Sequence, residues 1–169
     1  MDEFTDTYSD DLIYLAEARD TLLAQQRLEF DKQLCNAAFC RLLVVHMVDA
    51  MESCLKNWQN RDGTLLADYF GGKRKSNADR IASIKTALEK RNLPFDADVL
   101  SDYLAVKYIR KAITHSEWYE HEQAFVQDRR FPIDSREFTI DHWSRLLYIN
   151  DRMSMYLAVS RFFRGENPG

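Results

Sequence analysis

The sequence predicts an all-α protein, a helical bundle of about five main helices. Its 169 residues are 46% apolar, which is enough to bury one sizeable core. Glycine is rare, and none occurs between Lys73 and Arg164, a span too long for an architecture of strands and tight turns. Apolar side chains also recur every three or four residues, as on the buried face of a helix. We therefore expect one helical domain over residues 1–164 and a flexible tail over residues 165–169.

Two long helices are expected in the first 60 residues. The apolar positions of residues 8–27 repeat at helical spacing. Residues 28–58 continue without a helix breaker, and the apolar run Leu42 to Val45 suggests burial on more than one side. The segment Asn60 to Gly63 ends this helix, and Gly71-Gly72 marks an exposed loop.

The next elements are shorter. A helical turn over residues 65–70 precedes a helix that Ser76 and Asp79 open as a capping box and that Pro94 ends. A further helix begins at Ser101, a suitable cap for the apolar positions that follow.

The C-terminal part contains one irregular segment and one long helix. Periodicity fails over residues 120–138, where Pro132 intervenes, so we expect a loop or a short hairpin there. Thr139 then opens the last helix, in which Trp143 and Tyr156 are expected to belong to the core.

Composition excludes several classes of protein. The net charge is −4, and residues 1–62 carry 12 acidic against 6 basic side chains, so nucleic acid is not bound through bulk positive potential and any contact must be local. The acidic N-terminus and the lack of about 20 uninterrupted apolar residues predict a cytoplasmic protein that does not engage a membrane. Cys35, Cys40 and Cys54 are an odd number without CxxC spacing, which favours free thiols.

Motifs for metal and cofactor chemistry are absent from the sequence. Only His46 and Asp49 pair a histidine with a carboxylate at helical spacing, and there is neither an HExxH motif nor a pair of ExxH motifs. GxSxG, GxxxxGK[ST] and GxGxxG are also missing. We expect no bound metal and no cofactor.

The most informative segment runs from Lys107 to Tyr119. Arg110 stands five residues before His115, near the C-terminal end of a predicted helix. This arrangement resembles the Rx4–6H motif of HEPN domains, which are all-helical modules of prokaryotic toxin–antitoxin, abortive-infection and CRISPR-associated systems. The resemblance implies a metal-independent endoribonuclease or RNA-binding protein. It also implies a homodimer in which two motifs share one cleft, and an antitoxin protein as partner.

The chemistry of such a pair follows from its functional groups. RNA cleavage without metal requires the ribose 2′-hydroxyl to lose a proton while negative charge grows on the phosphoryl oxygens. His115 can move that proton, and Arg110 supplies a permanent forked cation for the phosphate. Additional phosphate contacts are expected from Lys111, Thr114, Ser116 and the loop residues Lys73, Arg74 and Lys75.

Helix geometry places a condition on this pair. Residues five apart on a regular helix are turned by about 140° from each other. The two side chains meet only if the helix loosens near Thr114 or if Arg110 reaches around it. Two positions also depart from the HEPN pattern: Lys111 stands where many members carry Asn or Asp, and Glu117 stands where one branch carries a tyrosine, here at Tyr119.

Two other functions remain open from the sequence. A non-catalytic helical module could bind a protein or a small ligand through its aromatic-rich helices. A metal-dependent bundle enzyme is the third possibility, and it requires histidines and carboxylates to converge in the fold.

Overall fold

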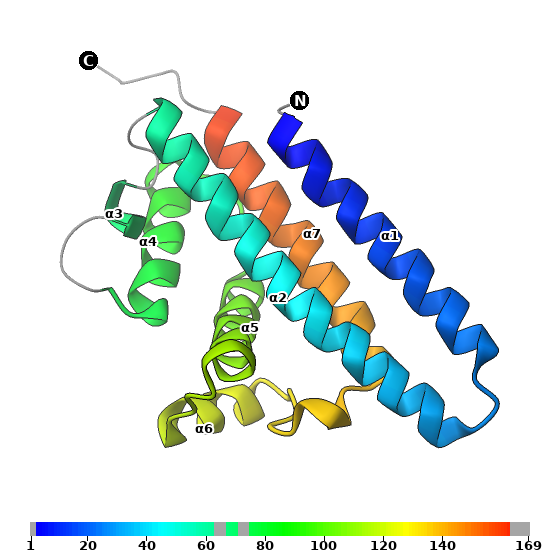
Figure 1. Ribbon diagram of the computed structural model, residues 1–169. Helices are drawn as coiled ribbons and strands as arrows, with labels where there is room; N and C mark the ends of the chain where they lie inside the picture. The colour runs from blue at the N-terminus through cyan, green and yellow to red at the C-terminus, as the bar shows by residue number, and fades with distance from the viewer. Residues whose placement is uncertain (1–2, 63–66, 71–74, 163–169) are drawn as a thin grey trace, which may run out of the picture.

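The computed structural model describes residues 3–62, 67–70 and 75–162, and in these ranges the chain is all-α without any strand (Figure 1). The predicted all-α class is therefore confirmed for the described residues. The elements are α1 (Glu3–Gln25), α2 (Glu29–Asp62), α3 (Ala67–Phe70), α4 (Asn77–Lys90), α5 (Ala97–His115), α6 (Glu120–Asp128), the 3-10 helix η1 (Ser135–Glu137) and α7 (Ile140–Phe162).

Helices α2 and α5 organise the bundle. The long helix α2 packs against α1, α5 and α7, and α5 also packs against α4, α6 and α7 (Figure 1). Both helices are thus surrounded by other elements. A buried side chain on either helix is therefore held by more than one neighbouring element, which is what a fixed functional group needs.

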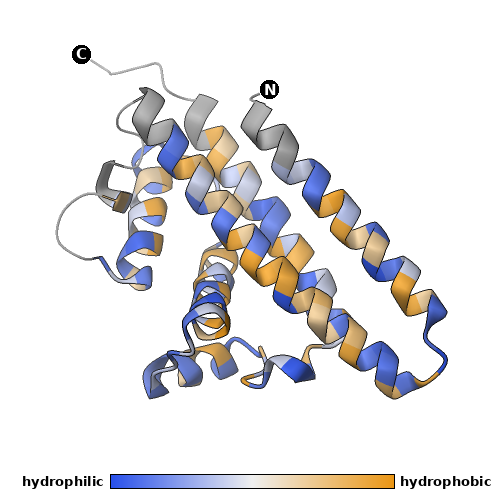
Figure 2. Ribbon diagram, in the orientation of Figure 1, coloured by the Kyte–Doolittle hydropathy of each residue, from blue (hydrophilic) through white to orange (hydrophobic). Residues whose placement is uncertain are grey.

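Helix α2 contributes more buried apolar side chains to the core than any other element. Leu43, Val44 and Met47 are fully buried, and Figure 2 shows the apolar residues of α2 gathered in its middle part. Complete burial of each such side chain stabilises the fold by about 1.5–3 kcal/mol. Leu42 departs from the expected run because its position on the helix faces solvent, where its side chain is 55% exposed.

The segment Glu29–Asn57 of α2 is long and apolar enough to cross a membrane by length and composition alone. Charged residues such as Arg41 and Asp49 interrupt it, so it is not a stretch of about 20 uninterrupted apolar residues. Within the protein, 56% of its most apolar window is buried, as in the core helix of a bundle.

The start of α4 follows local sequence signals. Ser76 Oγ accepts a hydrogen bond from Asp79 N at 3.1 Å, and Asp79 Oδ2 accepts one from Ser76 N at 2.9 Å. These two bonds form the predicted capping box. The helix ends at Lys90, ahead of Pro94.

The N-cap of helix α5 lies five residues earlier than expected. Asp96 is its N-cap, and its Oδ1 accepts a hydrogen bond from Asp98 N at 2.8 Å. Ser101, the predicted cap, lies inside the helix and donates its hydroxyl to Ala97 O. Aspartate caps a helix as well as serine does, and no residue between Asp96 and Ser101 breaks the helix.

The expectation of a loop or hairpin over residues 120–138 was wrong for its first half, because α6 occupies Glu120–Asp128, whereas residues 129–138 form a loop that contains only η1. This helix buries only Glu122 and Val126, so it carries almost no apolar period for the sequence to reveal. Its first turn is stabilised by Glu122, whose side chain accepts a hydrogen bond from Tyr119 N at 3.4 Å.

Helix α7 completes the core. Trp143 and Tyr156 are both buried, as predicted, and the Tyr156 hydroxyl accepts a hydrogen bond from Asp96 N at 2.9 Å. The expected tail over residues 165–169 lies outside the described residues. Cys35, Cys40 and Cys54 are thiols that form no disulfide, and burial raises the pKa of the Cys40 thiol to about 12.

Candidate functional site

The residues of the Rx4–6H motif lie at the C-terminal end of α5. His115 is the last residue of this helix and is exposed. Ser116 follows in the left-handed conformation, with φ of 55°, and its N–H donates to Ala112 O at 3.1 Å. This cap ends the helix directly after the histidine. The imidazole therefore lies where solvent and a ligand can reach it.

Arg110 and His115 contact each other. The distance between Arg110 Nη1 and His115 Nε2 is 3.3 Å. Helix α5 stays regular up to its end, and Thr114 Oγ1 donates to Arg110 O at 2.9 Å without breaking it. Of the two routes considered from the sequence, the structure therefore has the arginine reaching around the helix.

The contact defines the protonation state of the histidine in this arrangement. A guanidinium has only donors, so Nε2 of His115 must accept the hydrogen bond with its lone pair. The ring is then neutral and carries its proton on Nδ1. Both ring nitrogens are then occupied, so Nε2 can take up a proton only after Arg110 releases it.

Asp49 on α2 orients the guanidinium. Its Oδ1 accepts hydrogen bonds from Arg110 Nε at 3.1 Å and from Arg110 Nη2 at 2.7 Å. Because Asp49 occupies Nε and Nη2, Nη1 is the nitrogen that contacts His115. Sequence reasoning considered Asp49 only as a partner of His46 and missed this role.

A second ion pair lies beside the first on the same two helices. Lys107, which is 2% exposed, donates a hydrogen bond to Glu52 Oε1 and another to the Tyr69 hydroxyl at 3.1 Å. Arg80 of α4 also donates to Glu52 Oε1, at 3.3 Å. Two acidic residues three apart on α2 thus match two basic residues three apart on α5. That matched spacing was the signal available in the sequence.

Burial and charge act against each other in this cluster. Burial raises the pKa of Glu52, but Lys107, with Arg80 and Arg110, lowers it below its ordinary value overall. The pKa of Lys107 is lowered because burial outweighs the attraction of Glu52. Burial also raises the pKa of Tyr69 above its usual range. The cluster therefore holds α2 and α5 together through charges that are largely removed from water.

Lys111, a predicted phosphate contact, is directed toward α6. Its Nζ donates to both carboxylate oxygens of Glu122, at 3.0 and 3.2 Å, and lies 3.8 Å from Glu117 Oε2. It also lies 4.0 Å from the centre of the Tyr119 ring. Two carboxylates compensate this cation, so a phosphate would have to compete with them.

The other residues that were predicted to contact phosphate do not all lie near His115. Thr114 and Ser116 are exposed beside His115. Lys75 is half-buried at the start of α4 and donates to Ser83 Oγ at 3.4 Å. Lys73 and Arg74 lie outside the described residues.

The remaining histidines do not join the site. His46 Nε2 lies 3.3 Å from Tyr8 O, and the exposed His121 ring stacks on Tyr119. His142 is half-buried, because it packs against Phe138 just before the start of α7. In the part of the chain that the structure describes, no group of three or more His, Cys, Asp or Glu residues could hold a metal ion.

The arrangement combines an exposed neutral imidazole with a guanidinium oriented by a carboxylate. Such a pair can take a proton from a hydroxyl and place positive charge on a neighbouring anion. Comparisons of the chain with protein-family models, curated proteins and solved structures find no match.

Proposed function

We propose that this protein is a HEPN-like endoribonuclease that cleaves RNA without a metal, with Arg110 and His115 as its reacting pair. The observation that carries the proposal is the 3.3 Å contact between Arg110 Nη1 and His115 Nε2 at an exposed helix end. The contact supports the proposal because the two groups have complementary tasks on a ribose-phosphate linkage.

The cleavage begins at the 2′-hydroxyl next to the scissile phosphate. His115 Nε2 accepts the proton of that hydroxyl, and the 2′ oxygen attacks phosphorus. The bond from phosphorus to O5′ then breaks, which leaves a 2′,3′-cyclic phosphate and a 5′-hydroxyl. O5′ takes its proton from a water molecule at the site, and the imidazolium later releases its proton to solvent, so each histidine of the homodimer that the HEPN resemblance implies returns to its neutral form.

Arg110 stabilises the charge that develops during this step. On binding RNA, Nη1 moves its hydrogen bond from the imidazole to a phosphoryl oxygen, while Asp49 keeps hold of Nε and Nη2. This exchange frees the lone pair of Nε2 for the 2′-hydroxyl. A local cation of this kind is also compatible with a chain whose net charge is −4.

The biological setting of the proposal follows from the resemblance. We place the protein in the cytoplasm, as the ribonuclease of a toxin–antitoxin or defence system with an antitoxin protein as partner. RNA is the only nucleic acid on which this chemistry acts, because the nucleophile is the 2′-hydroxyl that DNA lacks.

The test is incubation of the purified protein with total RNA in the presence of a chelator. Wild type is expected to produce fragments with 2′,3′-cyclic phosphate ends, and His115→Ala is expected to abolish cleavage while keeping the helical circular dichroism spectrum. His121→Ala is the matched control, because that ring is exposed and outside the pair. Equal cleavage by His115→Ala would remove the assignment. An inert wild type that binds a protein partner tightly would favour the non-catalytic module.

A further inference from the structure

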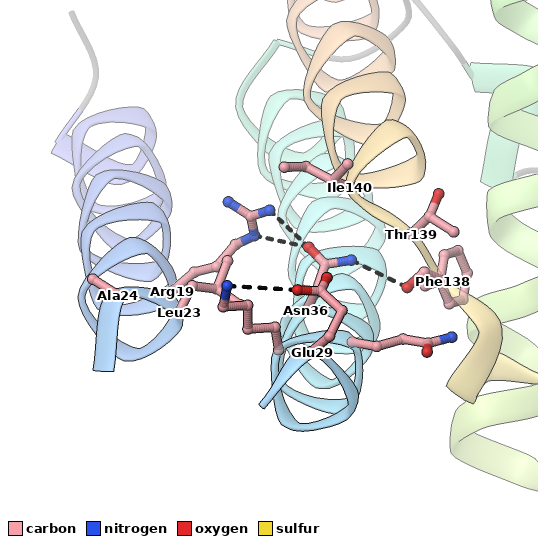
Figure 3. Close-up of a pocket in the computed structure, with 10 residues that line it drawn as sticks. Arg19, Leu23, Ala24, Glu29, Asn36, Phe138, Thr139 and Ile140 are labelled. Carbon is pink, nitrogen blue, oxygen red and sulfur yellow. Dashed lines mark hydrogen bonds and ion pairs between the residues drawn. The ribbon is translucent and has the colours of Figure 1, made fainter. Parts of the chain in front are cut away.

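A cavity of about 540 Å³ lies where the end of α1, the first turns of α2 and the start of α7 meet (Figure 3). None of its lining residues belongs to the Arg110–His115 site. Its apolar wall is formed by Leu23, Ala24, Phe138 and Ile140. This volume is within the range of small-molecule binding sites, about 300–1,000 Å³.

One side of the cavity is a buried arginine held in a fixed orientation. Arg19 is 5% exposed, and its Nε and Nη2 donate to Asn36 Oδ1 at 3.1 and 2.7 Å (Figure 3). Asn36 Nδ2 in turn donates to Phe138 O at 3.1 Å. The guanidinium carbon also lies 4.6 Å from the centre of the Trp143 ring. A side chain fixed on several sides can bind a ligand without a large loss of conformational entropy.

The charge of Arg19 is poorly compensated. Its carboxylate partner in the described part of the chain is Asp20, whose Oδ1 accepts from Nη1 at 2.7 Å but whose side chain is 72% exposed. An ion pair to such an exposed carboxylate contributes little. A buried charge without a buried counter-charge is costly, so an anion in the cavity would be favourable.

Arg19 also has donors to spare. Its hydrogen bonds within the described residues use three of the five N–H groups of a guanidinium. One N–H on Nη1 and one on Nη2 therefore lie outside these bonds. Two N–H groups of one guanidinium match the two oxygens of a carboxylate.

We propose that this cavity binds a small molecule with an apolar body and a single carboxylate. The carboxylate accepts hydrogen bonds from Arg19, and the apolar body packs against Leu23 and Ile140. Lys32 at the rim adds a second positive charge, although Glu29 lies 3.5 Å from it. One partly compensated arginine in an apolar cavity suits one negative charge better than a doubly charged phosphate, which is more costly to remove from water.

The charge requirement is tested with decanoate and decanol, which share an apolar chain and differ in the carboxylate. Isothermal titration calorimetry is expected to show saturable binding of one decanoate per chain, with decanol at least about tenfold weaker. Arg19→Gln is expected to abolish this preference. Equal affinity of the wild type for the two probes, or no saturable binding of decanoate, would overturn the proposal.

The location is tested without touching the arginine, because Arg19→Gln also removes contacts to Asn36 and Trp143 that stabilise the fold. Leu23→Trp fills the cavity and is expected to weaken decanoate binding at least about tenfold. Leu22→Trp is the matched control, since Leu22 is the neighbouring residue and is 41% exposed. Decanoate binding that survives Leu23→Trp unchanged would place the probe elsewhere and end the proposal.

Discussion

Asp49 of α2 holds Arg110 of α5 by accepting two hydrogen bonds on one carboxylate oxygen, at 3.1 and 2.7 Å. The two residues are 61 positions apart in the chain. This pair couples the packing of α2 against α5 to the position of the guanidinium next to His115. In the proposed nuclease, Asp49 is therefore a positioning residue that acts through Arg110.

Asp49→Asn is expected to lower RNA cleavage about tenfold, which corresponds to about 1.4 kcal/mol. The amide keeps a hydrogen-bond acceptor but loses the charge that orients Arg110. The measurement is the rate at saturating RNA, because a poorly oriented guanidinium affects the transition state more than binding.

The control for this prediction is Asp98→Asn, since Asp98 also pairs with an arginine but is 78% exposed and lies near the other end of α5. Its rate is expected to match that of the wild type. If both variants lose activity equally, Asp49 has no specific connection with the site.

Features were predictable from the sequence where the interacting residues are close together in the chain, and were not predictable where the residues are far apart in it. The start of α4 was predictable because Ser76 and Asp79 are three residues apart and satisfy each other locally. The hydrogen bonds from Arg110 to Asp49 were not predictable, because the sequence has many acidic residues and only tertiary packing determines which of them contacts this arginine. Lys111 shows the same difficulty, since its partner Glu122 lies on a helix that was not expected.

Substitutions of Lys107 and Glu52, which form an ion pair, are expected to have non-additive effects on the free energy of unfolding. Glu52→Gln leaves the buried ammonium of Lys107 without an anionic partner, so it should lower the free energy of unfolding by about 3 kcal/mol. Lys107→Met should cost less, because Glu52 keeps Arg80 at 3.3 Å. Urea unfolding of the two single variants and of the double variant measures the coupling.

The double variant is the decisive comparison. It removes both charges from the interface, and a buried pair replaced by neutral side chains costs less than an unpaired buried charge. We expect it to be more stable than Glu52→Gln alone. Strictly additive losses would show that the two groups do not interact.

Asp102 is expected to be the most important carboxylate between α5 and α7. Its side chain is 13% exposed and accepts from Arg129 Nε at 2.6 Å and from Arg145 Nη2 at 2.7 Å. Asp102→Asn should lower the free energy of unfolding by about 3 kcal/mol, because two arginines lose their shared counter-charge. Asp98→Asn is the control. Because Asp98 is exposed, this substitution should lower the free energy of unfolding in urea by less than about 0.5 kcal/mol. Equal losses would contradict this ranking.

His142 is expected to make the fold less stable in mild acid. Its Nδ1 accepts a hydrogen bond from Thr139 N at 3.0 Å, which caps the start of α7, and the imidazolium cannot accept it. Burial, with a smaller contribution from Arg145, lowers the pKa of His142 below 6.5. The unfolded chain therefore takes up this proton at a higher pH than the folded chain does. By linkage, the stabilisation is complete above pH 6.5 and is lost as the pH falls toward the lowered value.

His142→Gln separates the cap from the titration. A glutamine at this position can accept the same hydrogen bond from Thr139 N but carries no charge at any pH. Between pH 7.5 and pH 5, the wild type should lose up to about 1 kcal/mol more stability in urea than this variant, whose remaining slope comes from other groups. His121→Gln, a change of an exposed histidine, should keep the slope of the wild type. Identical slopes for wild type and His142→Gln would mean that this histidine keeps the same proton affinity in the folded and unfolded chain.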